Sequence, residues 1–261
     1  MKTLKKITDN FLKYRFLLSE LVKKGIKLKY RRSYLGIFWT LLEPLLTMMV
    51  LTFVFGEILG RGDETFPVYV LCGRLLYSFY SSSTKSCSKT IRTNAGMIKK
   101  VYVPKYLYPL SSVLYNYIIF LISLIVLVAV ALVLGVMPTL YLFQVFVPLI
   151  ALFLLSLGSG LVLAVLGVFF RDIEYIWDVA VMLIMYTSAI FYYPDKIMSG
   201  SKAMVLKINP LFCIIDNFRS AIFGEAMDLS LCAYSLLFAL CLIVIGVILF
   251  RKKQDEFILH I

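Results

Sequence analysis

The sequence predicts an all-α integral membrane protein with about six transmembrane helices. Of its 261 residues, 61% are hydrophobic and only 16% are charged, whereas about 25% of the residues of a typical soluble domain are charged. The apolar residues also form blocks long enough to cross a bilayer core of about 30 Å, which takes around 20 helical residues. Both observations indicate a chain embedded in a membrane.

Six apolar stretches are predicted to span the membrane. They lie at about residues 35–58, 66–84, 110–134, 141–169, 175–193 and 231–250. The third and sixth have the clearest apolar character, and the fourth is longer than a bilayer requires, so it tilts or begins in the interface. Residues 35–261 therefore form the predicted transmembrane domain, and residues 1–34 precede it as a cytoplasmic segment.

The basic residues are distributed very unevenly over the predicted loops. Residues 1–34 contain eleven Lys and Arg, and the loop from Thr84 to Lys105 contains six and no acidic residue. Basic loops stay in the cytoplasm, so both termini are predicted to be cytoplasmic. Because the basic residues cluster in these loops, the net charge of +12 reflects membrane topology, and no nucleic-acid partner is expected.

Residues 1–34 are predicted to form a basic amphipathic helix at the cytoplasmic interface. Apolar residues recur every three or four positions, with Lys and Arg between them: Leu4, Ile7, Phe11, Tyr14, Leu18 and Leu21. That pattern suits a helix lying on an anionic membrane surface, and Gly25 is expected to interrupt it. The helix would be an interfacial anchor alone or also a docking platform for a cytoplasmic partner.

The loop from Thr84 to Lys105 is predicted to contain a short helix. Ile91, Ala95 and Ile98 share one helical face, and Pro104 would end the element. An ordinary basic loop on the cytoplasmic side is an equally good interpretation of the sequence alone.

The segment from 194 to 230 is long for a connection between two spans. It contains a second apolar segment, Leu211 to Phe223, bounded by Asn209-Pro210 and Gly224. Thirteen residues that include Asp216 and Arg219 cannot span a bilayer, so a re-entrant or interfacial helix is predicted.

Two charged residues are predicted to lie inside the membrane, Glu43 in the first span and Arg74 in the second. An unpaired charge at that depth costs several kcal/mol, so the two could form an ion pair, or each could face a wet cavity. Pro44 follows Glu43 and is expected to kink the first span.

Small residues recur in the fourth span. Gly158, Gly160, Ala164 and Gly167 lie near one stripe of the helix, which permits close helix approach. The stripe would serve internal packing or a subunit interface.

The sequence lacks the motifs of enzymes and nucleotide-binding proteins. It has no GxxxxGK[ST] phosphate loop, DxD pair, HExxH or GxSxG, and its one histidine is His260. No catalytic residue, metal site or cofactor is therefore expected in this chain.

Four ordered motifs resemble permease subunits of ABC transporters of the ABC-2 type, most closely exporters of O-antigen, teichoic acid and related polysaccharides. The first is Tyr30-Arg31-Arg32-Ser33-Tyr34-Leu35-Gly36-Ile37-Phe38-Trp39, followed by Pro44. The others are Met97-Ile98-Lys99-Lys100-Val101 with Pro104, then Phe170-Arg171-Asp172-Ile173, and last Asn209-Pro210-Leu211 running to Asp216 and Phe218-Arg219. The family usually has Glu where this chain has Asp216.

The resemblance implies a homodimer of six-span subunits in the bacterial cell (inner) membrane. Two copies of a separate ATP-binding subunit would hold ATP and Mg, and the substrate would be a lipid-linked glycan exported from the cytoplasm, with membrane lipids around the dimer. An ABC-2 permease for a drug or lipid, a membrane-embedded enzyme, and a non-transporting membrane scaffold are the alternatives.

The resemblance also implies a cytoplasmic coupling helix, an extracytoplasmic re-entrant gate hairpin, and three sets of site residues. Coupling to the ATPase is expected at Glu20, Lys23, Lys24, Arg92, Asn94, Met97, Lys99 and Lys100. The channel or substrate path is expected at Trp39, Glu43, Arg74, Tyr77, Tyr80, Tyr186 and Tyr192. The gate is expected at Asn209, Pro210, Asp216 and Arg219.

Overall fold

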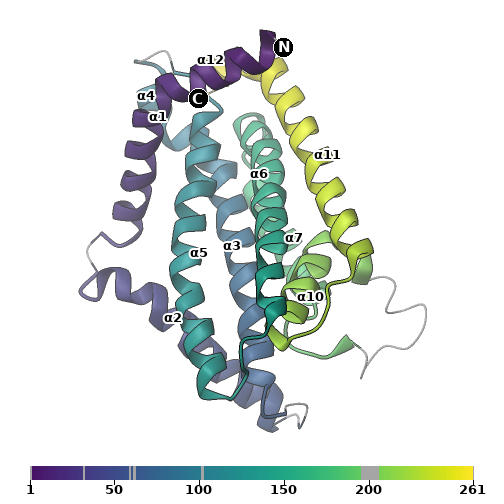
Figure 1. Ribbon diagram of the computed structural model, residues 1–261. Helices are drawn as coiled ribbons and strands as arrows, with labels where there is room; N and C mark the ends of the chain where they lie inside the picture. The colour runs from purple at the N-terminus through teal and green to yellow at the C-terminus, as the bar shows by residue number, and fades with distance from the viewer. Residues whose placement is uncertain are drawn as a thin grey trace.

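The computed structural model describes residues 2–31, 33–58, 60, 63–100, 103–194 and 206–260, with the backbone alone for residues 2–12. All regular structure in these ranges is helical, which confirms the predicted all-α class. The elements are α1 (Lys2–Lys29), η1 (Gly36–Phe38), α2 (Trp39–Leu51), η2 (Thr52–Ile58), α3 (Phe66–Thr93), α4 (Ala95–Ile98), α5 (Leu107–Val133), η3 (Leu140–Val145), α6 (Phe146–Phe169), α7 (Ile173–Thr187), α10 (Pro210–Phe223), α11 (Leu229–Lys253) and α12 (Phe257–His260). Figure 1 shows α3, α5 and α6 running side by side through the centre, with α11 along one edge.

Four helical segments in the described ranges are long and apolar enough to cross a membrane. They are Gly36–Ile58, Leu107–Val133, Leu140–Phe169 and Leu229–Lys253, and they confirm the first, third, fourth and sixth predicted spans. Helix α3 has sufficient length but carries several basic residues, and α7 has only 15 residues. A count of six spans therefore stays a prediction.

The helices that contain the second and fifth predicted spans end at other residues than those spans. Helix α3 continues to Thr93 instead of ending near residue 84, and the hydroxyl of Thr84 donates to the carbonyl of Tyr80 inside the helix. Helix α7 ends at Thr187 instead of 193. The chain turns there because Ala189 has a φ of 47°, in the left-handed region that terminates helices.

Helix α1 is one continuous helix, so the expected interruption at Gly25 is wrong. A Cβ at this position would lie 2.5 Å from Cδ1 of Tyr115 in α5, and glycine is what lets α1 approach α5 closely. Leu18 and Leu21 are buried, as the amphipathic pattern predicts. The side chains of Leu4, Ile7 and Phe11 lie outside the described residues.

The short helix predicted between Thr84 and Lys105 has only four residues. Ile91 belongs to the end of α3, and after Asn94 the chain makes only the four-residue helix α4. Ile91 and Ile98 are nevertheless buried in one cluster with Leu21 and Tyr108, so the shared apolar face exists. It anchors α4 against the bundle.

The small residues of α6 serve packing within the subunit. A Cβ at Gly158 would lie 2.8 Å from Cβ of Leu242 in α11, and one at Gly160 would lie 2.8 Å from Sγ of Cys87 in α3. At Gly167 the added atom would overlap the backbone carbonyl of Ser88, also in α3. Helix α6 is thus the central helix, flanked by α3 and α11.

The C-terminal helix α12 packs at the end of the bundle where α1 begins and α4 lies (Figure 1). Phe257 is fully buried, and its ring centroid lies 5.2 Å from that of Phe250 and 6.0 Å from that of Phe169. Lys105, in the segment before α5, donates a hydrogen bond to the carbonyl of Gln254. The basic segments therefore gather at one end of the molecule.

Candidate functional site

Pro44 lies inside α2 and leaves a backbone carbonyl without its helical donor. Proline has no N–H, so the carbonyl of Thr40, four residues earlier, lacks its usual partner. The hydroxyl of Ser123 in α5 donates to that carbonyl at 3.1 Å. A serine hydroxyl from a neighbouring helix commonly compensates for an intramembrane proline in this way, and here it also joins α2 to α5.

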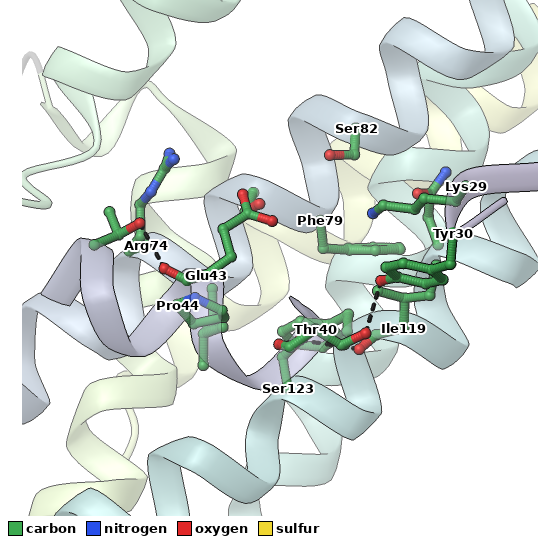
Figure 2. Close-up of a pocket in the computed structure, with 15 residues that line it drawn as sticks. Lys29, Tyr30, Thr40, Glu43, Pro44, Arg74, Phe79, Ser82, Ile119 and Ser123 are labelled. Carbon is green, nitrogen blue, oxygen red and sulfur yellow. Dashed lines mark hydrogen bonds between the residues drawn. The ribbon is translucent and has the colours of Figure 1, made fainter. Parts of the chain in front are cut away.

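A small cavity beside Pro44, the Glu43 cavity, brings charged side chains from three elements together. Its volume is about 50 Å³, and its charged lining residues are Lys29, Glu43 and Arg74. In Figure 2, Glu43 lies between Arg74 on one side and Lys29 with Tyr30 on the other. The cavity is far smaller than the roughly 300–1,000 Å³ of a typical ligand pocket, so it is a polar niche within the bundle.

The structure gives no ion pair between Glu43 and Arg74, which is one of the two arrangements that the sequence leaves open. In the described part of the chain, ion pairs within 4.0 Å join Glu20 to Lys23, Lys85 to Asp178, Arg92 to Glu174 and Lys253 to Glu256. The guanidinium of Arg74 instead lies 5.7 Å from the centroid of the Tyr77 ring. Both charges face the same polar cavity, which agrees with the alternative of charges in a wet environment.

The Glu43 cavity also affects the pKa of Lys29, which lies at the end of α1 and lines the cavity. Desolvation lowers the pKa of its ammonium group, and the negative charge of Glu43 acts in the opposite direction. The side chain of Tyr30 shares a hydrogen bond of 2.7 Å with Thr40. Electrostatics and hydrogen bonding thus connect the end of α1 to the start of α2.

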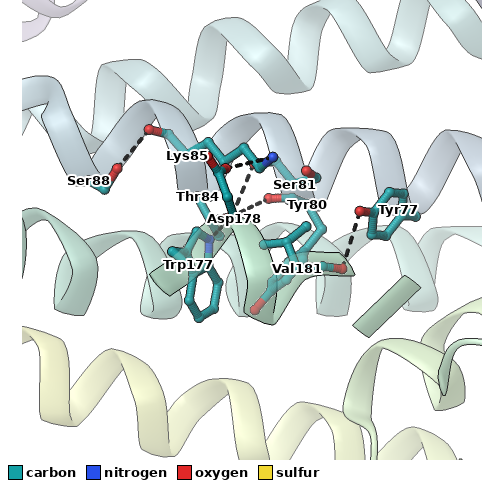
Figure 3. Close-up of polar contacts among 9 residues, drawn as sticks. All are labelled: Tyr77, Tyr80, Ser81, Thr84, Lys85, Ser88, Trp177, Asp178 and Val181. Carbon is teal, nitrogen blue, oxygen red and sulfur yellow. Dashed lines mark hydrogen bonds and ion pairs between the residues drawn. The ribbon is translucent and has the colours of Figure 1, made fainter. Parts of the chain in front are cut away.

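A row of polar contacts, the α3–α7 seam, holds α7 against α3 (Figure 3). Lys85 and Asp178 form an ion pair of 2.8 Å, and Nε1 of Trp177 donates to the hydroxyl of Thr84 at 2.9 Å. Further along, Tyr77 donates to the carbonyl of Val181 at 3.2 Å. Arg92 and Glu174 form another ion pair at the end of the seam nearest α4.

Arg219 of α10 is 4% exposed and ties three parts of the bundle together. Its guanidinium donates to the carbonyl of Tyr69 from Nε and Nη2 at 3.2 and 3.1 Å, and to the carbonyl of Ala189 from Nη1 at 3.1 Å. The guanidinium carbon also lies 3.4 Å from the centroid of the Tyr69 ring. A Cβ on Gly73 would lie 2.6 Å from Nη2, so that glycine leaves the space the arginine fills.

Helix α10 begins and ends where the sequence predicts. The side chain of Asn209 accepts from the backbone N–H of Leu211 at 3.0 Å and donates to Thr187 and Ser188 at the end of α7. Pro210 occupies the first helical position, which favours proline, and Gly224 ends the helix with a φ of 80°. Residues 195–205, the other part of the predicted hairpin, lie outside the described residues.

The sequence between residues 17 and 223 matches the family model described as ABC-2 type transporter. The chain belongs to the ABC-2 type transporter family. The match runs from the second half of α1 to the end of α10, and so includes the Glu43 cavity, the α3–α7 seam and Arg219. In ABC exporters, permeases of this family work together with an ATP-binding subunit, and this chain is a membrane protein of that permease type.

Curated proteins of the same ABC-2 kind are similar over nearly the whole chain. An "O-antigen export system permease protein RfbA" of Klebsiella pneumoniae is 28% identical, with 92% of this chain and 93% of the relative covered. A protein with the same name from Myxococcus xanthus is 28% identical, over 84% of this chain and 85% of the relative. The "Polysialic acid transport protein KpsM" of Escherichia coli is 24% identical, over 89% and 91%.

The coupling residues expected for an ABC-2 permease lie at the end of the bundle with α1, α4 and α12. Glu20 and Lys23 form an exposed ion pair of 2.9 Å on α1, and Lys99 and Lys100 are exposed after α4. Met97 packs onto the cluster of Ile91 and Tyr108, and Asn94 donates to the carbonyl of Thr90. Lys24 lines a cavity between α1, α3 and α5. Arg92 is engaged with Glu174 of α7.

The expected path residues of this ABC-2 chain fall into three groups by exposure. Trp39 and Tyr186 are 41% and 56% exposed, and Glu43 is exposed as well. Tyr77 and Tyr80 are instead buried inside the subunit, where the hydroxyl of Tyr80 shares a hydrogen bond of 3.1 Å with Ser159. The remaining two, Arg74 and Tyr192, are partly buried.

Sequence reasoning missed Glu174, Trp177 and Asp178, which build one side of the α3–α7 seam. A signal was present: two acidic residues four positions apart at the start of α7, and two basic residues, Lys85 and Arg92, on one face of α3. Opposite charges at these spacings predict facing helices. The pattern becomes evident only once α3 continues to Thr93, because Arg92 then lies on the same helix as Lys85.

We expect the Arg92–Glu174 ion pair to matter for activity more than any Glu43–Arg74 contact. Arg92→Glu or Glu174→Arg alone places like charges together in a partly buried site, so each should reduce transport activity at least several-fold. The double reversal should restore most of it, because the opposite charges then meet again. The transport activity of the protein carrying each variant gives the comparison, with Glu43→Arg/Arg74→Glu as the matched swap that is expected to restore nothing.

Proposed function

We propose that the chain is the permease subunit of a bacterial ABC exporter that moves a lipid-linked polysaccharide, an O-antigen-like or teichoic-acid-like glycan, from the cytoplasm across the cell (inner) membrane. The observation that carries this proposal is the similarity to O-antigen export permeases over more than four fifths of both chains. The polysialic acid transport protein is a second kind of polysaccharide transporter among its relatives.

The energy for export would come from a separate subunit. The sequence has no phosphate-loop motif, so two copies of an ATP-binding subunit would bind ATP and Mg and attach at the cytoplasmic end. The basic and amphipathic elements at one end of the bundle, α1, α4 and α12, support this placement (Figure 1). Both termini would then be cytoplasmic.

The translocation path would lie between two copies of the chain. Helices α2 and α7, together with η2, expose large apolar side chains in the single subunit: Leu46, Met49, Val50, Phe53, Ile176, Val179, Met182 and Leu183. An exposed apolar face of this size faces lipid or a partner. A homodimer would place the two faces around a shared conduit.

Exposed aromatic side chains would contact the moving glycan. Trp39 precedes the Glu43 cavity, and Tyr186 lies near the end of α7. Their ring faces can pack against sugar C–H groups, and repeated shallow contacts suit a polymer that slides. Helix α10, anchored by Arg219 and capped by Asn209, would with Asp216 form part of a gate at the extracytoplasmic end.

Deleting the gene and restoring it with variants tests this function. We expect the deletion to abolish the surface polysaccharide and to leave lipid-linked glycan inside the cell. Trp39→Ala/Tyr186→Ala should reduce export about tenfold, because both rings are expected to contact the glycan. The measurement is surface glycan by antibody or lectin binding, together with the intracellular lipid-linked pool.

Phe143→Ala is the matched control. Phe143 is 75% exposed in η3, an element that packs against α6 and α10, and it is not among the expected path or gate residues, so its removal should leave export unchanged. A deletion strain with normal surface polysaccharide would contradict the proposal, and a lost drug or lipid efflux in that strain would indicate a different substrate. Failure to copurify any ATP-binding subunit would instead favour a scaffold.

A further inference from the structure

A cavity of about 650 Å³, the lysine cavity, lies between α1, α3 and α5 beside the Glu43 cavity. Lys24 and Lys29 from α1 and Lys85 and Lys89 from α3 line it, and its lining contains no acidic residue. Lys85 is paired with Asp178. Among the described side chains, Lys24, Lys29 and Lys89 have no carboxylate within ion-pair distance. Glu43 acts on Lys29 from beyond that distance, so the lining keeps a net positive charge.

The wall of the lysine cavity is rich in hydroxyl and amide groups. Tyr115 donates to the hydroxyl of Ser86 at 2.9 Å, and Thr90 shares a hydrogen bond of 3.0 Å with Ser112. Asn116 lies beside them on α5. Lysine ammonium groups above neutral donors form a suitable environment for the oxygens of a phosphate group.

The apolar surface next to the cavity points to a lipid as the source of that phosphate. Leu28 in the lining is 52% exposed. From Tyr115 along α5, the exposed residues Ile118, Leu121 and Ile125 follow at helical spacing on one side of the helix. Helix α5 is one of the segments that can cross a membrane, so this stripe would face acyl chains.

We infer that the lysine cavity binds the phosphate of an anionic phospholipid from the cytoplasmic leaflet, with an acyl chain along the α5 stripe. Basic pockets between membrane helices on the cytoplasmic side are suited to acidic lipid headgroups. The lipid would sit where Gly25 lets α1 contact Tyr115. It would hold the interfacial helix α1 against the transmembrane bundle, independently of which substrate is exported.

Native mass spectrometry of the full-length protein in neutral detergent tests this site, with phosphatidylglycerol and phosphatidylcholine of equal chain length as probes. We expect the protein to retain phosphatidylglycerol tightly and to lose phosphatidylcholine. Lys24→Gln/Lys89→Gln should weaken phosphatidylglycerol binding about 25-fold, because each basic residue near an anionic headgroup contributes roughly a factor of five. Lys89→Gln alone should weaken it about fivefold and serves where the double variant does not fold.

Lys27→Gln/Lys99→Gln is the matched control, since it removes the same charge from α1 and from the end of α4 outside the cavity. It should leave phosphatidylglycerol binding unchanged. Equal weakening in both double variants, or equal retention of phosphatidylcholine, would overturn the inference. Displacement of phosphatidylglycerol by inorganic phosphate at similar concentration would also overturn it, because the cavity would then take phosphate from solution.

Discussion

Replacing Arg219 with alanine should destabilise the protein by about 3–5 kcal/mol, since charge-assisted hydrogen bonds contribute roughly 1.5–3 kcal/mol each. The substitution leaves the carbonyl of Ala189 without the guanidinium donor in a buried site. It also empties the space beside Gly73. The desolvation of the arginine itself offsets part of the loss. At about 2–4 °C per kcal/mol for a chain of this size, the melting temperature should fall by roughly 10 °C.

Thermal unfolding of the purified protein in detergent measures this effect, and surface glycan measures its consequence for export. Arg219→Lys should recover only part of the stability, because a lysine cannot reach the two carbonyls of Tyr69 and Ala189 with one planar fork. Arg74→Ala is the matched control on α3: Arg74 is only partly buried and makes no ion pair in the described structure. An equal fall of the melting temperature in Arg74→Ala and Arg219→Ala would contradict the anchoring role of Arg219.

The sequence predicts well those elements whose ends are encoded locally. Asn209-Pro210 and Gly224 delimit α10 because a side-chain cap, a proline at the first helical position and a left-handed glycine act within one turn. The four most apolar spans can also be predicted locally, because each is a continuous apolar stretch of sufficient length. The extension of α3 to Thr93 is not evident from the sequence, because serine and threonine are also common in loops. In α3 their hydroxyls donate to backbone carbonyls of the same helix.

Interactions between distant segments are beyond such local rules. Glu43 and Arg74 lie at similar predicted depths, yet helix rotation directs both to a shared cavity without contact. Arg219 is expected at a gate from the sequence, and in the structure its hydrogen-bond acceptors are the carbonyls of Tyr69 and Ala189. These residues lie 150 and 30 positions away along the chain. Backbone carbonyls leave no trace in residue identity, so this anchor could not be predicted.

The glycines of α6 show how strongly such distant contacts constrain the fold. Gly167→Ala should destabilise the protein by about 3 kcal/mol, at the upper end of overpacking costs, because the added Cβ meets the backbone carbonyl of Ser88. A carbonyl inside a helix cannot rotate away, so α3 would have to move away from α6. The seam that α3 makes with α7 would move with it, and export should fall together with the melting temperature.

A graded series isolates the cause. Gly160→Ala meets the thiol of Cys87, which can change rotamer, so its effect should be smaller than that of Gly167→Ala. Gly96→Ala in α4 has open space around the added atom and should be neutral or slightly stabilising, because alanine favours helix. Melting temperatures in the order Gly96→Ala, Gly160→Ala, Gly167→Ala, from highest to lowest, are expected. If Gly167→Ala were as stable as Gly96→Ala, α3 and α6 could not pack so closely that a Cβ at residue 167 overlaps the carbonyl of Ser88.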